Sequence, residues 1–383
     1  MELKKYKLGE CLELQRGYDL TSSQMQGGEV EVVGSNGIIG YHNSERGNSP
    51  CITVGRSGSV GKVHYYEQPT WAHNTALFIK DFKGNNPKYL YYLLKNLHLD
   101  NIFEKGSSVI PSLDRKLVHS LVVPFHKDIN DQRKVVDVLS AIDRKIELNK
   151  QINDNLEAMA KQLYDYWFVQ FDFPNEEGKP YKSSGGVMVW NEKLKREIPQ
   201  EWSDCKLKDF INLFDSKRVP LSSKDRGERQ GVYPYYGATG IMDYVNDYIF
   251  DGDYILLAED GSTSNAKGFP IVQYIWGKNW VNNHAHIILP KNERYMMFTY
   301  QMLRSIPAKQ IETGSIQKKI SQENLCGYKM VLPNSDLLEK YENVVSPLWE
   351  KRKRCIEEFN TLTKQRDELL PLLMNGQASV NSD

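Results

Sequence analysis

The sequence lacks several features that would place it in a class at once. No apolar run approaches the ~20 residues of a membrane-spanning helix, and the first residues, Met1 to Tyr6, contain no apolar signal core. The five cysteines are scattered and form no CxxC pair, which is typical of reduced thiols and not of a disulfide framework or a zinc site. We therefore expect a cytoplasmic protein of two or three domains, with no membrane association.

The chain also lacks an excess of charge of either sign. It has 49 basic and 49 acidic residues, so its formal net charge is zero. This balance argues against a protein that coats nucleic acid by charge alone. A DNA-reading protein remains compatible with it if the basic groups lie on one face, or if partner subunits contact the phosphates.

Catalytic motifs are missing as well. The segment Gly55–Lys62 resembles a phosphate-binding loop, but it is one residue too long, and Val63 stands where a Ser or Thr would bind Mg²⁺. No GxGxxG follows a strand, and no Asn-Pro-Pro-Phe or Asp-Pro-Pro-Tyr motif of an amino-methyltransferase occurs. We predict that the chain is not an enzyme.

Two short polar groups are candidates for metal or nuclease chemistry. His284 and His286 would share one face of a strand, but without a nearby carboxylate or cysteine set we expect ordinary packing and no metal site. Glu259 and Asp260 lie in a Gly-Ser loop with no lysine closely following, so we expect a solvated loop.

What the chain does contain is one long internal repeat, which is the first pattern to look for. Five blocks recur in the same order, the first two at an offset of 203 residues and the third at 210. The matched blocks are Val33–Ile38 with Tyr236–Ile241, Val54–Ser59 with Leu257–Thr263, Trp71–Ala76 with Val281–His286, Gly106–Ser107 with Gly314–Ser315, and Val122–Pro124 with Val331–Pro333. The alternative, Gly-Ser turns that recur by chance in a β-rich protein, does not explain the constant order.

Each copy has the same internal plan. Short runs of Val, Ile, Tyr and Phe between Gly, Asn, Ser and Pro predict strands; these are Ser49–Val54, Lys62–Tyr66, Ala76–Ile79, Asp253–Ala258 and Ile271–Trp276. A helical stretch follows in each copy, at Pro87–Leu94 and Tyr295–Leu303. We expect two β-rich domains in an α+β protein.

A long helix is predicted to close each copy. The segment Asp131–Phe168 has no glycine or proline, and apolar residues recur in it with alternating spacings of three and four, which is a heptad seam. The predicted seam positions are Leu139, Ile142, Ile146, Asn149, Asn153, Leu156 and Leu163 in the first helix, and Leu348, Cys355, Phe359, Leu362 and Leu369 in the second. Pro347 and Pro371 bracket the second seam, the first suiting an initial turn and the second a kink or an end.

A seam must be buried, and the other helix of the same chain is the simplest partner. The alternative is two amphipathic helices, each folded onto its own domain. We favour an antiparallel coiled coil, which would relate the two copies by a pseudo-twofold axis. The predicted segments are a first domain at 1–126, a helix at 127–170, a linker at 171–200, a second domain at 201–334, a helix at 335–376 and a tail at 377–383.

These features together resemble the specificity subunit of type I restriction-modification enzymes. The linker Asp172–Gly186, the segment Ile198–Trp202 and the C-terminal Leu369–Gln377 are similar to stretches of that family. The resemblance implies two target-recognition domains separated by the coiled coil, each reading one half of a bipartite, asymmetric DNA site, with the coil setting the spacer. Two rivals stay open: an adaptor that binds only proteins, and the specificity component of a fused restriction-methylation enzyme.

The resemblance also implies partners and cofactors. The partners would be double-stranded DNA, two methyltransferase subunits and the motor-nuclease subunits, with adenine methylation and restriction carried out by the partners. This chain would hold no cofactor; S-adenosylmethionine would be bound by the methyltransferase subunit, and ATP and Mg²⁺ by the motor-nuclease subunit.

Residues that suit phosphate or base-edge contact occur at matched places in the repeated loops. In the first copy the candidates are Ser35, Asn36, Arg56, Ser57, His73, Asn74, Lys105, Ser107 and Ser108. In the second copy they are Thr239, Ser262, Thr263, Asn265, Lys267, Asn283, His284, Ser315, Lys318 and Lys319. Each of them could instead be a turn residue that touches no DNA.

Overall fold

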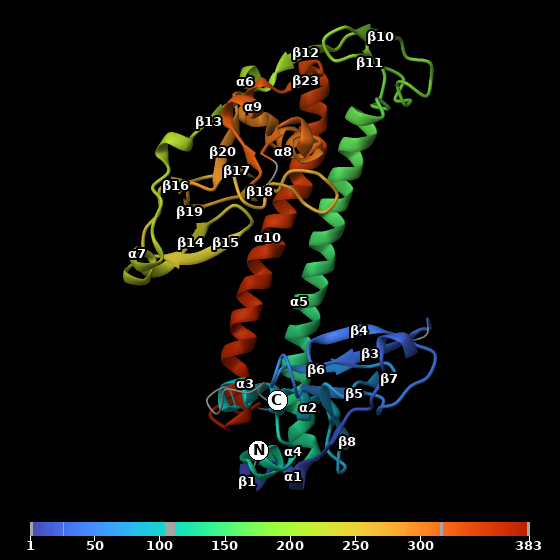
Figure 1. Ribbon diagram of the computed structural model, residues 1–383, viewed down its shortest axis with the longest axis vertical. Helices are drawn as coiled ribbons and strands as arrows, with labels where there is room; N and C mark the ends of the chain where they lie inside the picture. The colour runs from blue at the N-terminus through green and yellow to red at the C-terminus, as the bar shows by residue number, and fades with distance from the viewer. Residues whose placement is uncertain (1–2, 26, 104–111, 315–316, 381–383) are drawn as a thin grey trace. The chain divides into compact units, whose positions relative to one another are not determined.

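The computed structural model describes residues 3–25, 27–103, 112–314 and 317–380 (Figure 1). The chain divides into two compact units. The first unit comprises Met1–Gln151 and Ile356–Asp383, and the second comprises Ile152–Cys355. The unit boundaries fall within both long helices, so each helix contributes residues to both units.

The first unit contains three small sheets and its helices. The strands are β1 Leu3–Lys7, β2 Glu13–Arg16, β3 Val30–Gly34, β4 Gly37–His42, β5 Cys51–Gly55, β6 Val63–Tyr66, β7 Thr70–Ala72, β8 Ala76–Asp81 and β9 Val122–His126. The helices are α1 Leu8–Cys11, α2 Pro87–Asn96, α3 Leu99–Phe103, α4 Arg115–Ser120 and the first part of α5 Ile129–Tyr164. Asn86 caps α2 by accepting from the N–H groups of Lys88 and Tyr89.

The second unit repeats this content. Its strands are β10 Met188–Asn191, β11 Arg196–Pro199, β12 Ser203–Lys206, β13 Ile211–Leu213, β14 Gln230–Tyr236, β15 Ile241–Val245, β16 Phe250–Asp251, β17 Tyr254–Ala258, β18 Val272–Ile275, β19 Lys278–Val281, β20 Ala285–Pro290, β21 Glu312–Thr313, β22 Lys319–Ile320 and β23 Lys329–Leu332. Its helices are α6 Leu207–Phe210, α7 Ser223–Glu228, α8 Met296–Ser305, α9 Gln322–Gly327 and the first part of α10 Ser335–Met374. The strand and helix types predicted from the sequence are confirmed in both units.

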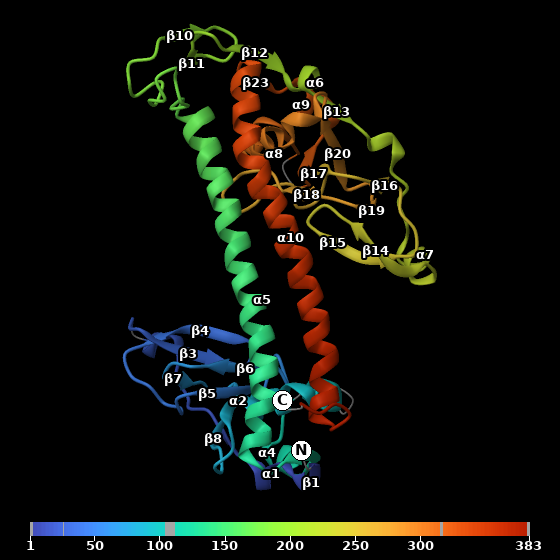
Figure 2. The same ribbon diagram turned by 180° about the vertical axis from the view of Figure 1, so that it is seen from behind.

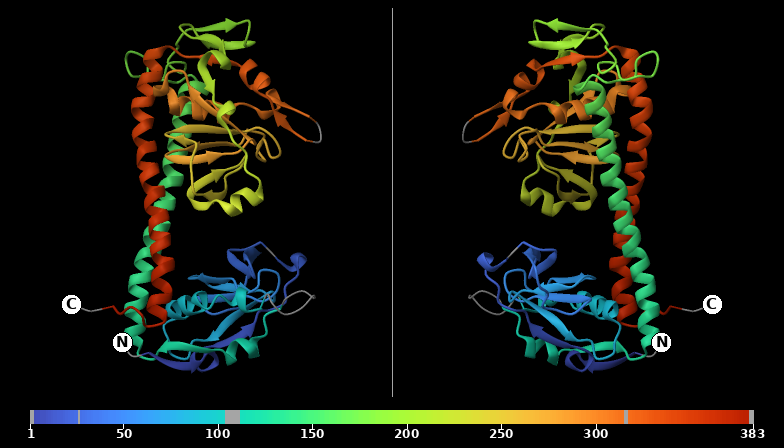
Figure 3. Two further views of the ribbon diagram at one scale, coloured as in Figure 1. Left: turned by 90° about the vertical axis from the view of Figure 1, so that its left-hand side faces the viewer. Right: turned by 90° about the vertical axis from the view of Figure 1, so that its right-hand side faces the viewer.

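The predicted internal repeat is confirmed by the strand order. The sheet β2-β8-β5-β6 of the first unit has the same order as β13-β20-β17-β18, and β4-β3-β7 matches β15-β14-β19. Figure 3 shows the strands of each unit from two sides, in blue for the first unit and in yellow to orange for the second. The pair β1-β9 likewise matches β12-β23. The register also agrees with the offset of 203, because Val33 pairs with Ile38 and Tyr236 pairs with Ile241.

The register corrects two of the predicted offsets. Gly55 pairs with Ala76 and Ala258 pairs with Ala285, so the third block is displaced by 209 residues and not by 210. The last block was also misaligned, because Lys7 pairs with Val122 whereas Lys206 pairs with Lys329, which is an offset of 207. Because neighbouring side chains are similar, the two copies can be misaligned by one or two residues in sequence, and strand pairing identifies the correct alignment. Gly106 and Ser107 lie outside the described residues.

The two long helices pair in antiparallel fashion within each unit (Figure 2). In the first unit Asn149 donates to Glu358 at 3.0 Å and Arg366 donates to Asp143 at 3.3 Å, so one residue number falls as the other rises. In the second unit Arg352 donates to Glu157 at 2.6 Å, and the Tyr341 hydroxyl donates to the Ala160 carbonyl at 3.4 Å. Every predicted seam position is buried or half-buried; these are Leu139, Ile142, Ile146, Asn149, Asn153, Leu156, Leu163, Leu348, Cys355, Phe359, Leu362 and Leu369.

The prolines of α10 do not lie where the sequence suggested. The helix begins at Ser335, so Pro347 lies in its interior, and it continues past Pro371 to Met374. Proline removes one backbone hydrogen bond from a helix. Packing accounts for the difference, since Tyr341, Val345 and Trp349 on either side of Pro347 are all buried in the core of the second unit.

The segment expected to be a plain linker joins the core of the second unit. Phe173 stacks on Tyr181 at 4.6 Å and on Trp202 at 5.1 Å between ring centroids. The strands β10 and β11 then form an antiparallel hairpin. Three aromatic rings thus order a stretch whose polar and turn-forming composition suggested only a loop. Among the described helices, none is long and apolar enough to cross a membrane.

Candidate nucleic-acid interface

Six of the predicted first-copy residues come from three loops that meet at one edge of the first unit. The backbone N–H groups of Arg56 and Ser57 donate to the Thr75 carbonyl at 2.9 and 3.1 Å. The N–H of Ser35 donates to the Thr75 hydroxyl at 3.3 Å, and that of His73 to the Val33 carbonyl at 2.9 Å. The candidates gathered there are Ser35, Asn36, Arg56, Ser57, His73 and Asn74. Lys105, Ser107 and Ser108 lie outside the described residues.

The side chains of this cluster differ in how far they are already engaged. Asn36 accepts from Lys62 at 2.8 Å, and Asn74 donates to Asp19, which also pairs with Arg16 at 3.2 Å. Arg56 differs, because its Nη1 is buried and has no hydrogen-bond partner within the described chain. The residue as a whole is half-buried, and a guanidinium is the type of group that contacts phosphates and base edges.

The second unit builds the corresponding cluster. The Glu259 N–H donates to the His284 carbonyl at 2.8 Å, as Arg56 does to Thr75, and the His284 ring lies 2.6 Å from Asp260. Lys318 and Lys319 pair with Glu312 and Glu259 at 3.1 and 3.2 Å. The exposed candidates of this unit are Thr239, Ser262, Asn265, Lys267, Asn283, His284, Lys318 and Lys319.

Two second-copy candidates drop out of this group. The Thr263 side chain is 1% exposed and donates to Glu312 at 2.7 Å, so it stabilises the loop from beneath and is not accessible to a ligand. Ser315 lies outside the described residues. Asn265 is exposed, but its carbonyl oxygen accepts from the N–H groups of Lys267 and Phe269, which makes it a turn-forming residue as well.

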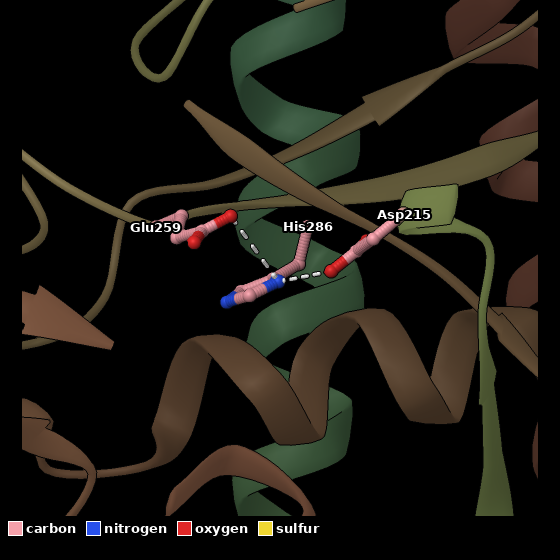
Figure 4. A group of neighbouring side chains, drawn as sticks. All are labelled: Asp215, Glu259 and His286. Atoms are coloured by element: carbon pink, nitrogen blue, oxygen red, sulfur yellow. Dashed lines mark hydrogen bonds and ion pairs between the residues drawn. The ribbon is translucent and has the colours of Figure 1, made fainter. Parts of the chain in front are cut away.

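A buried ionic network lies beneath these loops (Figure 4). The His286 Nδ1 is 2.6 Å from Asp215 and 3.8 Å from Glu259, while its Nε2 is 2.7 Å from the Ile320 carbonyl. Arg218 donates to Glu259 at 2.8 Å, and to the carbonyls of Asn283 at 3.2 Å and Ala285 at 2.8 Å. The network therefore links four chain segments.

The carboxylates of this network are held ionised. Burial alone would raise the pKa of Asp215, but hydrogen bonds from His286, the Ile287 N–H and Gln322 bring that pKa below its ordinary value. Burial opposes ionisation of Glu259 too, and Arg218, His286 and Lys319 together lower its pKa. Both ring nitrogens of His286 face oxygen atoms, Nδ1 that of the Asp215 carboxylate and Nε2 that of the Ile320 carbonyl.

This network corrects the two expectations for polar groups of the second copy. His286 was expected to lack a carboxylate nearby, but the fold brings Asp215 and Glu259 to it from 71 and 27 positions away in the chain. Glu259 was expected in a solvated loop, yet its side chain is 15% exposed. The group has the composition of a metal site, and in the structure its side chains contact one another through hydrogen bonds and ion pairs.

Sequence reasoning missed the residues that organise both clusters, namely Arg16 and Asp19 in the first unit and Asp215 and Arg218 in the second. Arg16 ends strand β2 and Asp19 follows it, while Asp215 and Arg218 follow β13; the two strands pair with β8 and β20 at equivalent places. The repeated blocks that are recognisable in the sequence begin only at Val33, after β2. An alignment extended to these strands, at an offset of 199, would have placed Arg16 opposite Asp215.

Two units of one topology, each with a polar loop cluster at the same place, define a duplicated recognition protein. A sequence model of the family described as "Type I restriction modification DNA specificity domain" matches residues 1–158 and 199–340. The chain therefore belongs to this family, and it is a non-catalytic specificity subunit of a type I restriction-modification system.

Individual relatives agree with this assignment. The HindI specificity subunit of Haemophilus influenzae is 37% identical over 367 residues, which cover 76% of this chain and 77% of the relative. The MjaIX specificity subunit of Methanocaldococcus jannaschii is 25% identical over 344 residues, or 84% of this chain and 76% of the relative. The crystal structure of the S subunit from M. genitalium shares the fold, with a TM-score of 0.65, 18% identity and coverage of 97% and 96% of the two chains.

Proposed function

We propose that this chain reads a bipartite, asymmetric DNA site and directs adenine methylation and restriction by partner subunits. The first unit would read one half of the site, and the second unit would read the other. The observation that carries the proposal is the pair of polar loop clusters at equivalent positions of two units with one topology. Their side chains are of the types that contact phosphates and base edges.

The long helices support a second part of the proposal, in which the coiled coil sets the unread spacer. The helices α5 and α10 have 36 and 40 residues, and a helix of 36 residues extends about 54 Å. Two readers on one face of B-DNA must be spaced by about a helical turn or a multiple of it. A helix pair holds such a distance better than a flexible linker.

Partners supply the chemistry in this proposal. Two methyltransferase subunits would bring S-adenosylmethionine, and motor-nuclease subunits would bring ATP and Mg²⁺. We place the complex in the cytoplasm, which suits five cysteines that are all free thiols. The zero net charge fits a reader whose partners contribute phosphate contacts.

The experiment is co-expression of this chain with its cognate methyltransferase subunit in a host without adenine methylation. Methylated adenines are then mapped across the genome by long-read sequencing. The proposal expects one split motif with a fixed spacer. Methylation without a split motif would contradict the two-reader arrangement, and no DNA selectivity at any salt concentration would favour the protein-only adaptor.

A further inference from the structure

The buried ionic network of the second unit has no counterpart among the described residues of the first. Strand pairing places Asp215 at the position of Arg16, Glu259 at that of Arg56, and His286 at that of Leu77. Two carboxylates and a histidine thus replace two arginines and a leucine. Since the first unit forms the same sheet with a buried leucine at this place, the fold itself does not require the network.

Burying these charges has a cost that packing does not explain. The side chains of His286, Asp215 and Glu259 are 0%, 3% and 15% exposed. Removing charged groups from water costs several kcal/mol per ion before ion pairing offsets it, and apolar replacements are often neutral or stabilising (about 1–4 kcal/mol). The network is therefore better explained by what it positions than by the stability it adds.

The network positions the candidate contact loops. Arg218 holds the carbonyls of Asn283 and Ala285, on either side of His284. Glu259 holds Lys319 at 3.2 Å, and Asp260 forms a backbone bridge with Lys319. The Lys319 side chain remains 52% exposed, so its ammonium group has a fixed direction and open access.

We propose that Asp215, Glu259 and His286 are positioning residues that determine which bases the second unit accepts, acting through Arg218 and Lys319. This inference rests on the proposed DNA-reading function. A lysine held in one direction discriminates the N7 and O6 acceptors of guanine from other base edges better than a freely rotating one. In the first unit Arg56 stands at the position of Glu259, and the described residues around it form no such network.

The test uses the complex with the methyltransferase subunit and compares the methylated motif of variants with that of the wild type. Glu259→Gln keeps the size of the side chain but removes the charge that holds Arg218 and Lys319. We expect relaxed discrimination by about tenfold at one or more bases of one half-site, with the other half-site unchanged. Glu192→Gln is the matched control, because Glu192 pairs with Lys195 at 2.8 Å and both side chains are more than 70% exposed outside these loops.

A structural role alone would lower the unfolding temperature and total methylation without changing base identity, so base identity is the deciding readout. If Glu259→Gln impairs folding, Lys319→Gln replaces an exposed side chain and should relax the same half-site. An unchanged motif in a folded Glu259→Gln complex, or in Lys319→Gln, would overturn the inference while leaving the proposed function intact. A wild-type complex without a split motif would overturn both.

Discussion

Arg56 is the residue on which recognition by the first unit is expected to depend most. The residue is half-buried beside the loop cluster, and a guanidinium is the group that pairs with guanine O6 and N7 in direct readout. We predict that Arg56→Gln lowers discrimination at one half-site by about 1–3 kcal/mol, which is roughly 5- to 150-fold. Motif mapping measures this, with Lys80→Gln, on an exposed strand position paired with Glu13, as the control. Equal losses at both half-sites would argue against separate readers.

Glu342 gives the second unit a stability that depends on pH. Burial raises the pKa of this carboxyl to about 7, although it accepts from the N–H groups of Phe298 and Met297 at the start of α8. Because the folded pKa lies above the unfolded one, the stability is fully present below about pH 4.5 and is lost as pH rises towards 7.

The wild type loses up to about 3 kcal/mol of its free energy of unfolding as Glu342 ionises, and we predict that Glu342→Gln abolishes this loss. Relative to the wild type, the variant therefore becomes more stable between pH 5 and pH 8. Gln132 in the first unit shows that a side-chain amide can accept such a hydrogen bond, since its Oε1 accepts from the Asn86 N–H at the start of α2. Denaturant unfolding at both pH values measures the difference, with Glu339→Gln on the exposed side of α10 as the control. A constant difference across this range would show that Glu342 is ionised throughout.

At the scale of single residues, the sequence predicted which residues gather in the loops better than it predicted which side chains contact one another. The candidates from Ser35 to Asn74 do meet in one cluster, because the repeated Gly-Ser turns mark strand ends. The partners of His286 could not be predicted, since Asp215, Glu259 and Ile320 reach it from three distant segments. Whether any of these residues touches DNA stays a prediction.

The two asparagines of the α5 seam differ in what they contact. Asn149 is buried and donates to Glu358 at 3.0 Å, whereas the Oδ1 of Asn153 is buried with no partner among the described residues. An unpaired buried carbonyl costs roughly 1–3 kcal/mol. We predict that Asn153→Leu raises the free energy of unfolding by about 1 kcal/mol more than Asn149→Leu does. Equal effects in denaturant unfolding would mean that the Asn149 hydrogen bond contributes nothing.

At the scale of elements, periodicity predicted both long helices and their antiparallel pairing. The roles of Pro347 and Pro371 were less predictable, because both residues lie inside α10. The segment 171–200 was predicted to be a plain linker from its Gly, Pro and Ser content, which gives no sign that Phe173 stacks on Tyr181 and Trp202. Tertiary packing overrides local propensity in each of these places.

At the scale of the whole molecule, one topology is used twice while the recognition loops differ in charge. The repeat and its first offset of 203 could be found from the sequence, whereas the later offsets of 209 and 207 emerge only from strand pairing. A repeated fold with different loops is suited to a protein that recognises two different half-sites.

The most direct test exchanges one reader and leaves the other in place. Residues 207–333 are replaced by the corresponding segment of the HindI specificity subunit, and the complex is mapped by long-read methylation sequencing. The account predicts a new split motif in which one half-site is changed, the other is unchanged and the spacer is kept. A change in both half-sites, or in neither, from a folded and active complex would contradict it.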